Sequence, residues 1–197
     1  MNHKTFIFIG RSGCGKGTQS KLLMDYLKKL DPSKESLYIY NGAEFREFIK
    51  GDSETQKLCK EVYDVGGLQP EFLAVYFWSK AVVTKYSGKE HLFFDGVPRK
   101  YHEAGVLHSI VDFYKLEKPY VINLDISEEE SIKRLMGRGR FDDNIEDIKV
   151  RLSWYETEVG PAIEFYRNNP GYYFAQINGN RPIEEVHQDI IDKFNLK

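Results

Sequence analysis

Cysteine is nearly absent from this sequence, since Cys14 and Cys59 are the only two among 197 residues. Two cysteines exclude a disulfide framework as the basis of the fold, and without neighbouring histidines they cannot form a four-ligand zinc site. Long apolar runs are also missing. The run Phe6–Ile9 is too short for the core of a signal peptide, and no run approaches the ~20 residues of a membrane helix. We therefore expect a cytoplasmic protein of a reducing compartment, with no membrane partner.

A strong charge imbalance is lacking as well. The 28 lysines and arginines nearly match the 30 aspartates and glutamates, which gives a formal net charge of −2. This balance argues against a nucleic-acid partner held by phosphate electrostatics. We find no internal repeat, low-complexity tract or flexible linker. With 41% hydrophobic residues, residues 1–197 are expected to form a single domain.

Short apolar runs alternate with longer amphipathic stretches along the chain. The stretch Gly17–Leu30 has apolar residues at helical spacing, and Ser127 begins a capping-box pattern. A long apolar stripe from Asp143 predicts a helix that Pro161 kinks. Residues 41–70 lack a clear strand and are expected to form a helical insertion. The pattern predicts a three-layer α/β fold. Its parallel sheet would have five strands, at Thr5–Ile9, Leu37–Tyr40, His91–Phe94, Tyr120–Ile126 and Tyr172–Ile177.

A glycine-rich segment, GRSGCGKGT, covers residues 10–18 between the first expected strand and the first expected helix. Glycines let successive backbone N–H groups point inward, and the helix N-terminus adds positive potential. Lys16 would place a point charge on the β and γ phosphates of a nucleoside triphosphate. A tight turn without a ligand is the alternative, but strand, helix, glycine spacing and lysine occur together. Cys14 is either a thiol activated by the helix N-terminus or, more simply, a small residue that fits the loop.

Ligands for magnesium are few near this loop. The residue after the lysine is Gly17, and a hydroxyl comes one position later, from Thr18, so direct ligation by a loop hydroxyl is not expected. Asp95 ends an expected strand beside the loop and could hold Mg²⁺ through water. Alternatively, Asp95-Gly96 forms only a turn.

Arginines occur where a site for phosphates would need them. Arg46 lies in the helical insertion, and Arg151 lies at the edge of the long apolar stripe. Three more arginines precede Asp142-Asp143 and suit a mobile lid over phosphates, although such a run can also be a solvated face. These three are Arg134, Arg138 and Arg140.

The chain resembles the adenylate kinases, in the short-lid form of the nucleoside monophosphate kinase family, over essentially its whole length. GRSGCGKGTQ is similar to the family's GKGTQ loop, and NGAEFR at residues 41–46 falls on the family's Thr-Gly-Asp-x-x-Arg segment. GLQP at 67–70 falls on the loop that touches the acceptor base, and DGVPR at 95–99 is similar to Asp-Gly-Phe-Pro-Arg. The lid and post-lid pattern falls on Arg138, Arg140, Asp142, Asp143 and Arg151.

The resemblance implies Mg²⁺-dependent phosphoryl transfer from ATP to AMP by a monomer. It implies that Lys16 and Arg138 hold the donor phosphates, and that Arg46 and Arg99 clamp the monophosphate. The implied catalytic set is Lys16, Arg99, Arg138, Arg140 and Arg151, with Asp142 and Asp143 supporting the lid. Further ATP contacts are implied for Gly13, Cys14, Gly15, Gly17, Thr18, Arg134 and Arg181. Further acceptor contacts are implied for Asn41, Gly67, Leu68, Gln69, Gly96, Val97, Pro98 and Glu103.

The resemblance also assigns residues 41–70 to the monophosphate-binding insertion and residues 137–143 to a minimal lid. This lid is shorter than the family's short form and has no cysteine, so no structural zinc is expected there.

The base of the acceptor stays open. The family's adenine-reading glutamine falls at Glu103, and its threonine falls at Asn41. A glutamine amide both donates and accepts hydrogen bonds, whereas a carboxylate only accepts them. Glu103 therefore suits the N1–H and 2-amino donors of guanine, or one amino group of adenine or cytosine. AMP is favoured by the overall pattern, with GMP or CMP and UMP as alternatives.

Two other classes of protein fit the sequence less well. A P-loop GTPase switch would need an Asn-Lys-x-Asp segment, which the sequence does not contain. A catalytically silent nucleotide-binding scaffold would be suggested by loss of Lys16 or of the arginines, and all are present. The remaining aromatic residues are expected to pack the core and the helix faces, namely Trp78, Trp154, Tyr166 and the 172–174 segment.

The short lid predicts wasted ATP. A lid must close to exclude water, since water otherwise accepts the phosphoryl group. We expect more release of inorganic phosphate from ATP alone than a long-lid relative shows, measured without an acceptor. Equal release from the two proteins would contradict this expectation.

Overall fold

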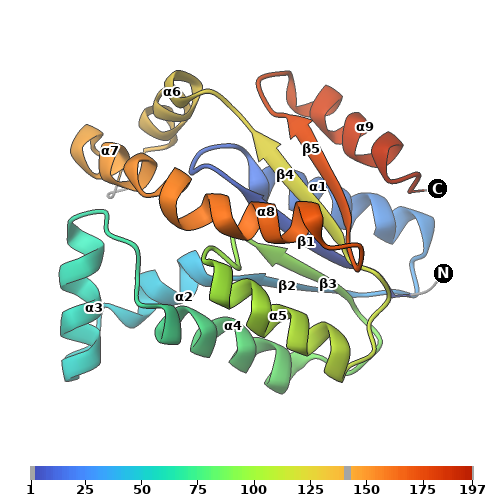
Figure 1. Ribbon diagram of the computed structural model, residues 1–197, viewed down its shortest axis with the longest axis horizontal. Coiled ribbons are helices and arrows are strands. Elements are labelled where there is room, and N and C mark those ends of the chain that lie inside the picture. The colour runs from blue at the N-terminus through green and yellow to red at the C-terminus, as the bar shows by residue number, and fades with distance from the viewer. Residues whose placement is uncertain (1–2, 140–142, 197) are drawn as a thin grey trace.

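One parallel β-sheet organises the chain (Figure 1). The computed structural model describes residues 3–139 and 143–196. Its strands run in the order β2-β3-β1-β4-β5, and every neighbouring pair is parallel. The predicted five-stranded parallel sheet is therefore confirmed, with strand ends that differ from expectation by one residue. The strands are β1 (Thr5–Gly10), β2 (Ser36–Tyr40), β3 (His91–Asp95), β4 (Tyr120–Asp125) and β5 (Tyr173–Asn178).

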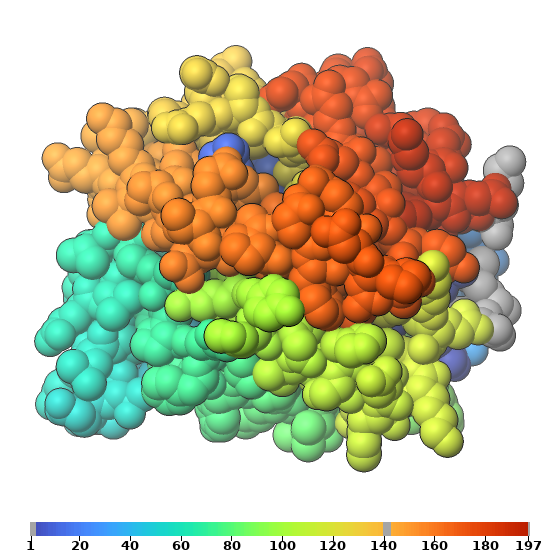
Figure 2. All heavy atoms as spheres, in the orientation of Figure 1, coloured from blue at the N-terminus to red at the C-terminus, as the bar shows by residue number. Residues whose placement is uncertain are grey.

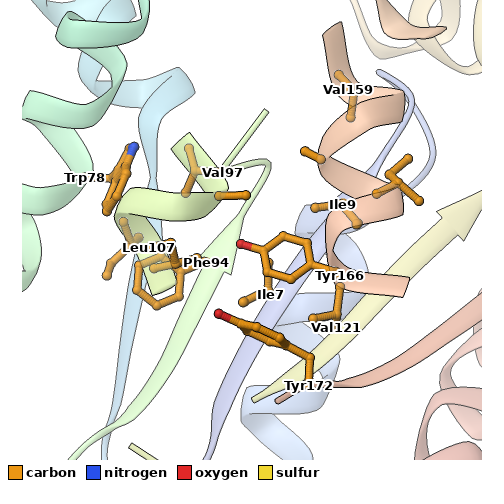
Figure 3. Close-up of a cluster of buried hydrophobic side chains, with 14 of the residues drawn as sticks. Ile7, Ile9, Trp78, Phe94, Val97, Leu107, Val121, Val159, Tyr166 and Tyr172 are labelled. Atoms are coloured by element: carbon orange, nitrogen blue, oxygen red, sulfur yellow. The ribbon is translucent and has the colours of Figure 1, made fainter. Parts of the chain in front are cut away.

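Helices cover both faces of this sheet, which explains why the central strands are continuously apolar. Ile7 of β1 packs in a cluster with Trp78 of α4 and Tyr166 of α8. Figure 3 shows Ile7 near Tyr166, with Trp78 on the far side of the cluster beside Leu107 and Phe94. Phe8 of β1 faces the other way and packs in a cluster with α1 and α9. The helices are α1 (Lys16–Leu30), α4 (Glu71–Lys85), α5 (Tyr101–Phe113), α6 (Glu128–Arg138), α8 (Gly160–Asn168) and α9 (Ile183–Lys193).

Residues 41–70 contain two short helices, α2 (Asn41–Phe48) and α3 (Glu54–Asp64). With α4 they enclose a separate small apolar cluster that includes Phe45, Cys59 and Phe77. Ser53 and Gln56 form a reciprocal capping box at the start of α3, a local signal that fixes where this helix begins. The segment has its own small core, and its proposed role in binding a monophosphate stays a prediction.

The long helix expected from Asp143 is divided into three segments. These are α7 (Ile145–Ser153), the π-helical turn η1 (Tyr155–Val159) and α8. Pro161 lies in the first turn of α8 rather than at a kink within one helix. Because proline excludes the carbonyl four residues before it, the preceding turn widens, and the Gly160 N–H donates to the Tyr155 carbonyl five residues back.

The capping box predicted at Ser127 is only half formed. The Ser127 hydroxyl accepts from the Glu130 N–H at 3.2 Å, as an N-cap should. The Glu130 carboxylate, however, accepts from Arg134 at 2.7 Å instead of reaching back to the Ser127 N–H. A charge-assisted bond is stronger than one to a neutral amide, so the ion pair takes the side chain. No helix within the described ranges combines the length and the apolar character needed to cross a membrane.

His91 begins β3 and is 1% exposed. Its Nδ1 accepts the backbone N–H of Lys4 at 2.9 Å, a bond that only an unprotonated nitrogen can accept. Burial, together with the nearby positive charges of His3, Lys4 and Lys34, lowers the pKa of His91 to about 4. The folded protein therefore holds this imidazole neutral under conditions in which the unfolded chain protonates it.

We expect this histidine to make the fold acid-sensitive. Between its ordinary pKa of 6.5 and about 4, the unfolded state binds a proton that the folded state does not. Stability is therefore lost as the pH falls through that window, by roughly 2 kcal/mol between about pH 7 and pH 5. Urea unfolding of the wild type and of His91→Gln at both pH values isolates the effect, because the carboxylates are common to both proteins. An equal acid loss in the two proteins would contradict it.

Candidate active site

A cavity of about 1030 Å³ lies at the carboxyl ends of β1, β2 and β3, where parallel α/β sheets bind their ligands. Its wall includes the glycine-rich loop after β1, parts of α2, the β3–α5 connection and the ends of α6 and α7. In the space-filling view, blue atoms from the N-terminal part of the chain lie in a recess between the α6 and α7–η1 segments (Figure 2).

The loop between β1 and α1 is shaped by close backbone packing. Gly10 has φ +138°, and a Cβ there would lie 2.3 Å from the Leu124 carbonyl oxygen of β4, so only glycine fits. Gly15 caps α1 in the left-handed conformation, and the first turn of α1 has neither a side-chain cap nor an acidic residue. The orphan N–H groups of this helix N-terminus therefore suit an anion.

Lys16 folds its ammonium group over this loop. Nζ donates to the carbonyls of Gly10 and Arg11, both at 2.8 Å. Cys14 is 2% exposed and packs in the apolar cluster of α1 and α9, as the simpler interpretation of this residue requires. Arg11 is not among the residues that line the cavity. Its guanidinium lies 4.5 Å from the Tyr155 ring centre and pairs with Glu156 of η1.

Two arginines of the opposite wall are held by neutral groups. Arg46 of α2 donates weakly to the Tyr40 hydroxyl, at 3.4 and 3.5 Å, and its charge lies 5.6 Å from that ring. Arg99 donates to the Gly96 carbonyl at 3.2 Å and lies 5.5 Å from the Trp154 ring. Within residues 3–139 and 143–196, neither guanidinium has a carboxylate partner, so each keeps its charge for a ligand.

Asp143 joins two further arginines. It accepts two bonds from Arg138, at 2.8 and 2.7 Å, and one from Arg151 at 3.1 Å. Its side chain is 1% exposed. Burial acts to raise the pKa of Asp143, but the bonds and charges of Arg138 and Arg151 outweigh burial and hold the pKa below its ordinary value. This carboxylate therefore fixes two cations side by side although they repel each other.

Arg134 and Arg181 lie at the far end of the cavity. Arg134 bonds Glu130 and the Gly179 carbonyl, at 2.7 and 2.8 Å. Arg181 pairs with Asp189 at 2.6 Å. Both are held chiefly by protein groups, so their guanidinium planes form part of the wall.

Three of the side chains predicted to contact the acceptor carry oxygens. Glu103 is 1% exposed, and its Oε2 accepts the Arg99 N–H at 3.0 Å. Gln69 donates its amide to the Cys59 carbonyl, and Asn41 donates its amide to the Ala74 carbonyl, each at 2.9 Å. Because a carbonyl only accepts, these bonds fix both amide orientations. The carbonyl oxygens of Asn41 and Gln69 are buried with no partner among the described residues.

Asp95 ends β3 and is 4% exposed. It accepts a short hydrogen bond from the Tyr38 hydroxyl of β2. Within residues 3–139 and 143–196, no group of three or more His, Cys, Asp or Glu residues is arranged to hold a metal ion. A carboxylate beside a phosphate loop fits a metal that takes its other ligands from phosphate and water.

The structure brings most of the predicted site residues to this one cavity. Asp143 is not among the lining residues, because it acts behind Arg138 and Arg151. Arg140 and Asp142, with residue 141 of the expected lid, lie outside the described residues. The predicted site residues that line the cavity are Gly13, Cys14, Gly15, Lys16, Gly17, Thr18, Asn41, Arg46, Gly67, Leu68, Gln69, Asp95, Gly96, Val97, Pro98, Arg99, Glu103, Arg134, Arg138, Arg151 and Arg181.

Aromatic residues of the cavity were not found by sequence reasoning. Trp154 was expected only to pack core and helix faces, yet it lines the cavity, and its Nε1 donates to the Gly66 carbonyl at 3.3 Å. Tyr38 and Tyr40 line it as well. Their one signal was a position near the carboxyl end of a strand, which aromatic β-propensity also explains.

Comparison with known proteins places the chain in a family. The family model for adenylate kinase matches residues 8–170. The adenylate kinase of Parabacteroides distasonis is 34% identical over 193 residues, which covers 96% of each chain. That of Leptospira biflexa is 33% identical, over 95% of this chain and 98% of the relative. That of Encephalitozoon cuniculi is 30% identical, over 86% of each.

A P-loop α/β fold with a cation-lined cavity defines a phosphotransferase of the nucleotide kinase class. Within that class, the chain belongs to the adenylate kinase family. The resemblance stated from the motifs is thereby confirmed.

Removing the charge that joins the two arginines should destabilise the fold. We expect Asp143→Asn to lower the free energy of unfolding by about 2 kcal/mol, because two guanidinium groups lose a charged acceptor. Urea denaturation at neutral pH measures it. Glu164→Gln removes an exposed carboxylate that pairs with Arg167 and should cost less than about 0.5 kcal/mol. Equal losses in the two variants would contradict the structural role of Asp143.

Proposed function

We propose that this chain transfers the γ-phosphoryl group of ATP to a nucleoside monophosphate, with AMP as the preferred acceptor. The observation that carries the proposal is the meeting of Lys16, Arg46, Arg99, Arg138 and Arg151 around one cavity from separate elements of the fold. Such a ring of cations fits two phosphorylated substrates facing each other. The family membership of the chain supports the same reaction.

The donor side is the loop between β1 and α1. The uncapped N-terminus of α1 and the Lys16 ammonium would hold the β and γ phosphates. In the structure, Lys16 donates to two loop carbonyls, which a phosphate oxygen would replace as acceptors. Arg138 approaches from the end of α6 and would add charge over the donor phosphates.

The acceptor side is formed by α2 and the β3–α5 connection. Arg46 and Arg99 would clamp the monophosphate, because each has donor capacity that its weak neutral partners do not use up. Arg151 would lie between the two substrates, with Arg140 beside it as an expectation from the motif alone.

Positioning and charge would supply the catalysis. In an in-line transfer, an oxygen of the acceptor phosphate attacks γ-phosphorus while the bond to the leaving β-phosphate oxygen breaks. Negative charge spreads over the oxygens of the transferring group, and fixed guanidinium groups stabilise it without reorganising. No protein nucleophile is required, in keeping with an acceptor that is already an anion.

Magnesium is the proposed cofactor, since the family uses ATP with Mg²⁺. When bound, the ion would neutralise charge on the donor phosphates. Asp95, buried at the end of β3 beside the loop, is the residue that would hold it through water. Monomeric action is likewise proposed from the resemblance.

GMP is a second candidate acceptor, and a specific observation favours it. One amide N–H of Asn41 and one of Gln69 donate to backbone carbonyls, while both amide oxygens are buried with no partner among the described residues. These oxygens and the Glu103 carboxylate therefore have unused acceptor capacity. Guanine offers N1–H and 2-amino donors, whereas adenine offers an acceptor at N1. Burial raises the pKa of Glu103, with the Arg99 N–H bond and charge opposing it. The neutral acid that this shift favours has an O–H to donate, which suits adenine.

Product analysis tests the proposal directly. The purified protein receives Mg²⁺-ATP with AMP, GMP, CMP, UMP or dTMP in separate reactions. We expect ADP from AMP at a rate well above the others. A preference for GMP would show that the Glu103 carboxylate sets the polarity of the pocket. Binding of ATP with no transfer to any acceptor would leave a silent scaffold and contradict the proposal.

Glu103→Gln sharpens the test of the base. The amide oxygen still accepts the Arg99 N–H, and the amide adds a donor for adenine N1, so kcat/KM for AMP should rise about tenfold relative to that for GMP. The gain should be smaller in mildly acidic than in alkaline solution, because the raised pKa of Glu103 favours the neutral acid, which lets the wild type donate as the pH falls. Unchanged base preference at both pH values would exclude Glu103 from base recognition.

A further inference from the structure

We infer that the Tyr38 hydroxyl is a positioning group for the metal site, taking the place of the hydroxyl that this phosphate loop lacks after its lysine. The inference rests on the proposed binding of a metal nucleotide at the loop. It concerns the chain's own residues Tyr38, Asp95 and Gly17, whose side chains or backbone converge at one edge of the cavity.

Strand register delivers the phenol to the carboxylate. In the parallel pair of β2 and β3, Tyr38 is opposite Phe93 and Tyr40 is opposite Asp95. Side chains two residues apart on a strand share a face, so Tyr38 and Asp95 lie on the same side of the sheet. The long phenol spans the offset, and its hydroxyl donates to Asp95 Oδ2.

Because Gly17 has no side chain, the hydrogen-bonded side chains of Tyr38 and Asp95 can lie close to its backbone. A Cβ built on Gly17 would lie 3.3 Å from Asp95 Oδ2 and 3.6 Å from the Tyr38 hydroxyl oxygen. In the general phosphate-loop motif, the residue after the lysine carries a hydroxyl that ligates magnesium. Here that position has no side chain, and a hydroxyl from another strand reaches the same neighbourhood. Gly17 is in the first turn of α1, and Tyr38 is on the edge strand β2. The two residues therefore come together only through the tertiary fold.

The hydrogen bond would act on the metal through orientation. The hydrogen bond from Tyr38 restricts rotation of the Asp95 carboxylate, and it takes one of the about four acceptor positions of such a group. Partners that orient a ligand typically change metal affinity by ~10-fold or more when removed. Tyr38 does not touch the reacting atoms in this scheme and acts through Asp95.

Equilibrium metal binding tests the inference without turnover. Mn²⁺ replaces Mg²⁺ as a paramagnetic probe, and free Mn²⁺ is measured by electron paramagnetic resonance during titration of the full chain saturated with ADP. We expect Tyr38→Phe to raise the Kd for Mn²⁺ about tenfold, while the Kd for ADP in EDTA stays at the wild-type value. A general structural defect would weaken both.

Two further variants complete the design. Tyr173→Phe also removes one hydroxyl from an exposed tyrosine of an edge strand and should leave the Kd for Mn²⁺ unchanged. If Tyr38 acts through Asp95, adding Tyr38→Phe to Asp95→Asn should weaken Mn²⁺ binding no further. A wild-type Kd in Tyr38→Phe, or a full additional loss in the double variant, would overturn the inference. A wild type that binds no ADP would overturn the proposed function with it.

Discussion

Repulsion among like charges is the constraint on which the site depends. Five of the cations that line the cavity are proposed to hold phosphates, and three of these five are held by neutral groups: Lys16 by carbonyls, Arg46 by a phenol, Arg99 by a carbonyl and an indole. The remaining pair, Arg138 and Arg151, share one buried carboxylate. Neutral partners fix the position of a cation without cancelling its charge. The cavity therefore keeps a positive potential that only a multiply charged anion relieves.

The rest of the fold holds those cations at separate positions around the cavity. The parallel sheet puts the ends of β1 and β3 at one edge, and thus the phosphate loop beside Asp95. Arg46 is on α2, and apolar residues of α2 pack with α3 and α4 in a small cluster separate from the main core. The turn η1 carries Tyr155 against Arg11, which ties the phosphate loop to the segment that follows Arg151. Each cation thus comes from a differently supported element.

Much of this fold could be predicted because its signals are local. Continuous apolar runs and glycine-rich turns set every strand to within a residue, and Ser127 marked the start of α6. Local signals failed where two partners competed for one group. Glu130 bonds Arg134 rather than completing its capping box, and the backbone widens into η1 ahead of Pro161. Residue spacing predicts neither the Glu130–Arg134 bond nor the π-helical turn, because each depends on the relative strength of competing contacts, which the sequence does not show.

The charged residues of the site were predictable for a different reason, since the motifs retain them at fixed spacing. Their partners were not. The sequence offers Glu103 as a hydrogen-bond acceptor, but only the tertiary contacts of Asn41 and Gln69 reveal that one N–H of each amide beside it donates to a backbone carbonyl. In the sequence, Tyr38 is not distinguished from any other aromatic residue of a strand. Its contact with Asp95 depends on the register of β2 and β3, which brings its hydroxyl to the carboxylate.

The two tryptophans of this chain occupy contrasting surroundings. Trp78 is 1% exposed in the core, whereas Trp154 is part of the cavity wall between Arg99 and the Gly66 carbonyl. Indole emission responds to nearby charge and hydration, so a change in intrinsic fluorescence on adding a ligand arises at Trp154, with Trp78 as a constant background. The protein therefore carries a built-in optical reporter of the cavity wall beside Arg99, which needs no label.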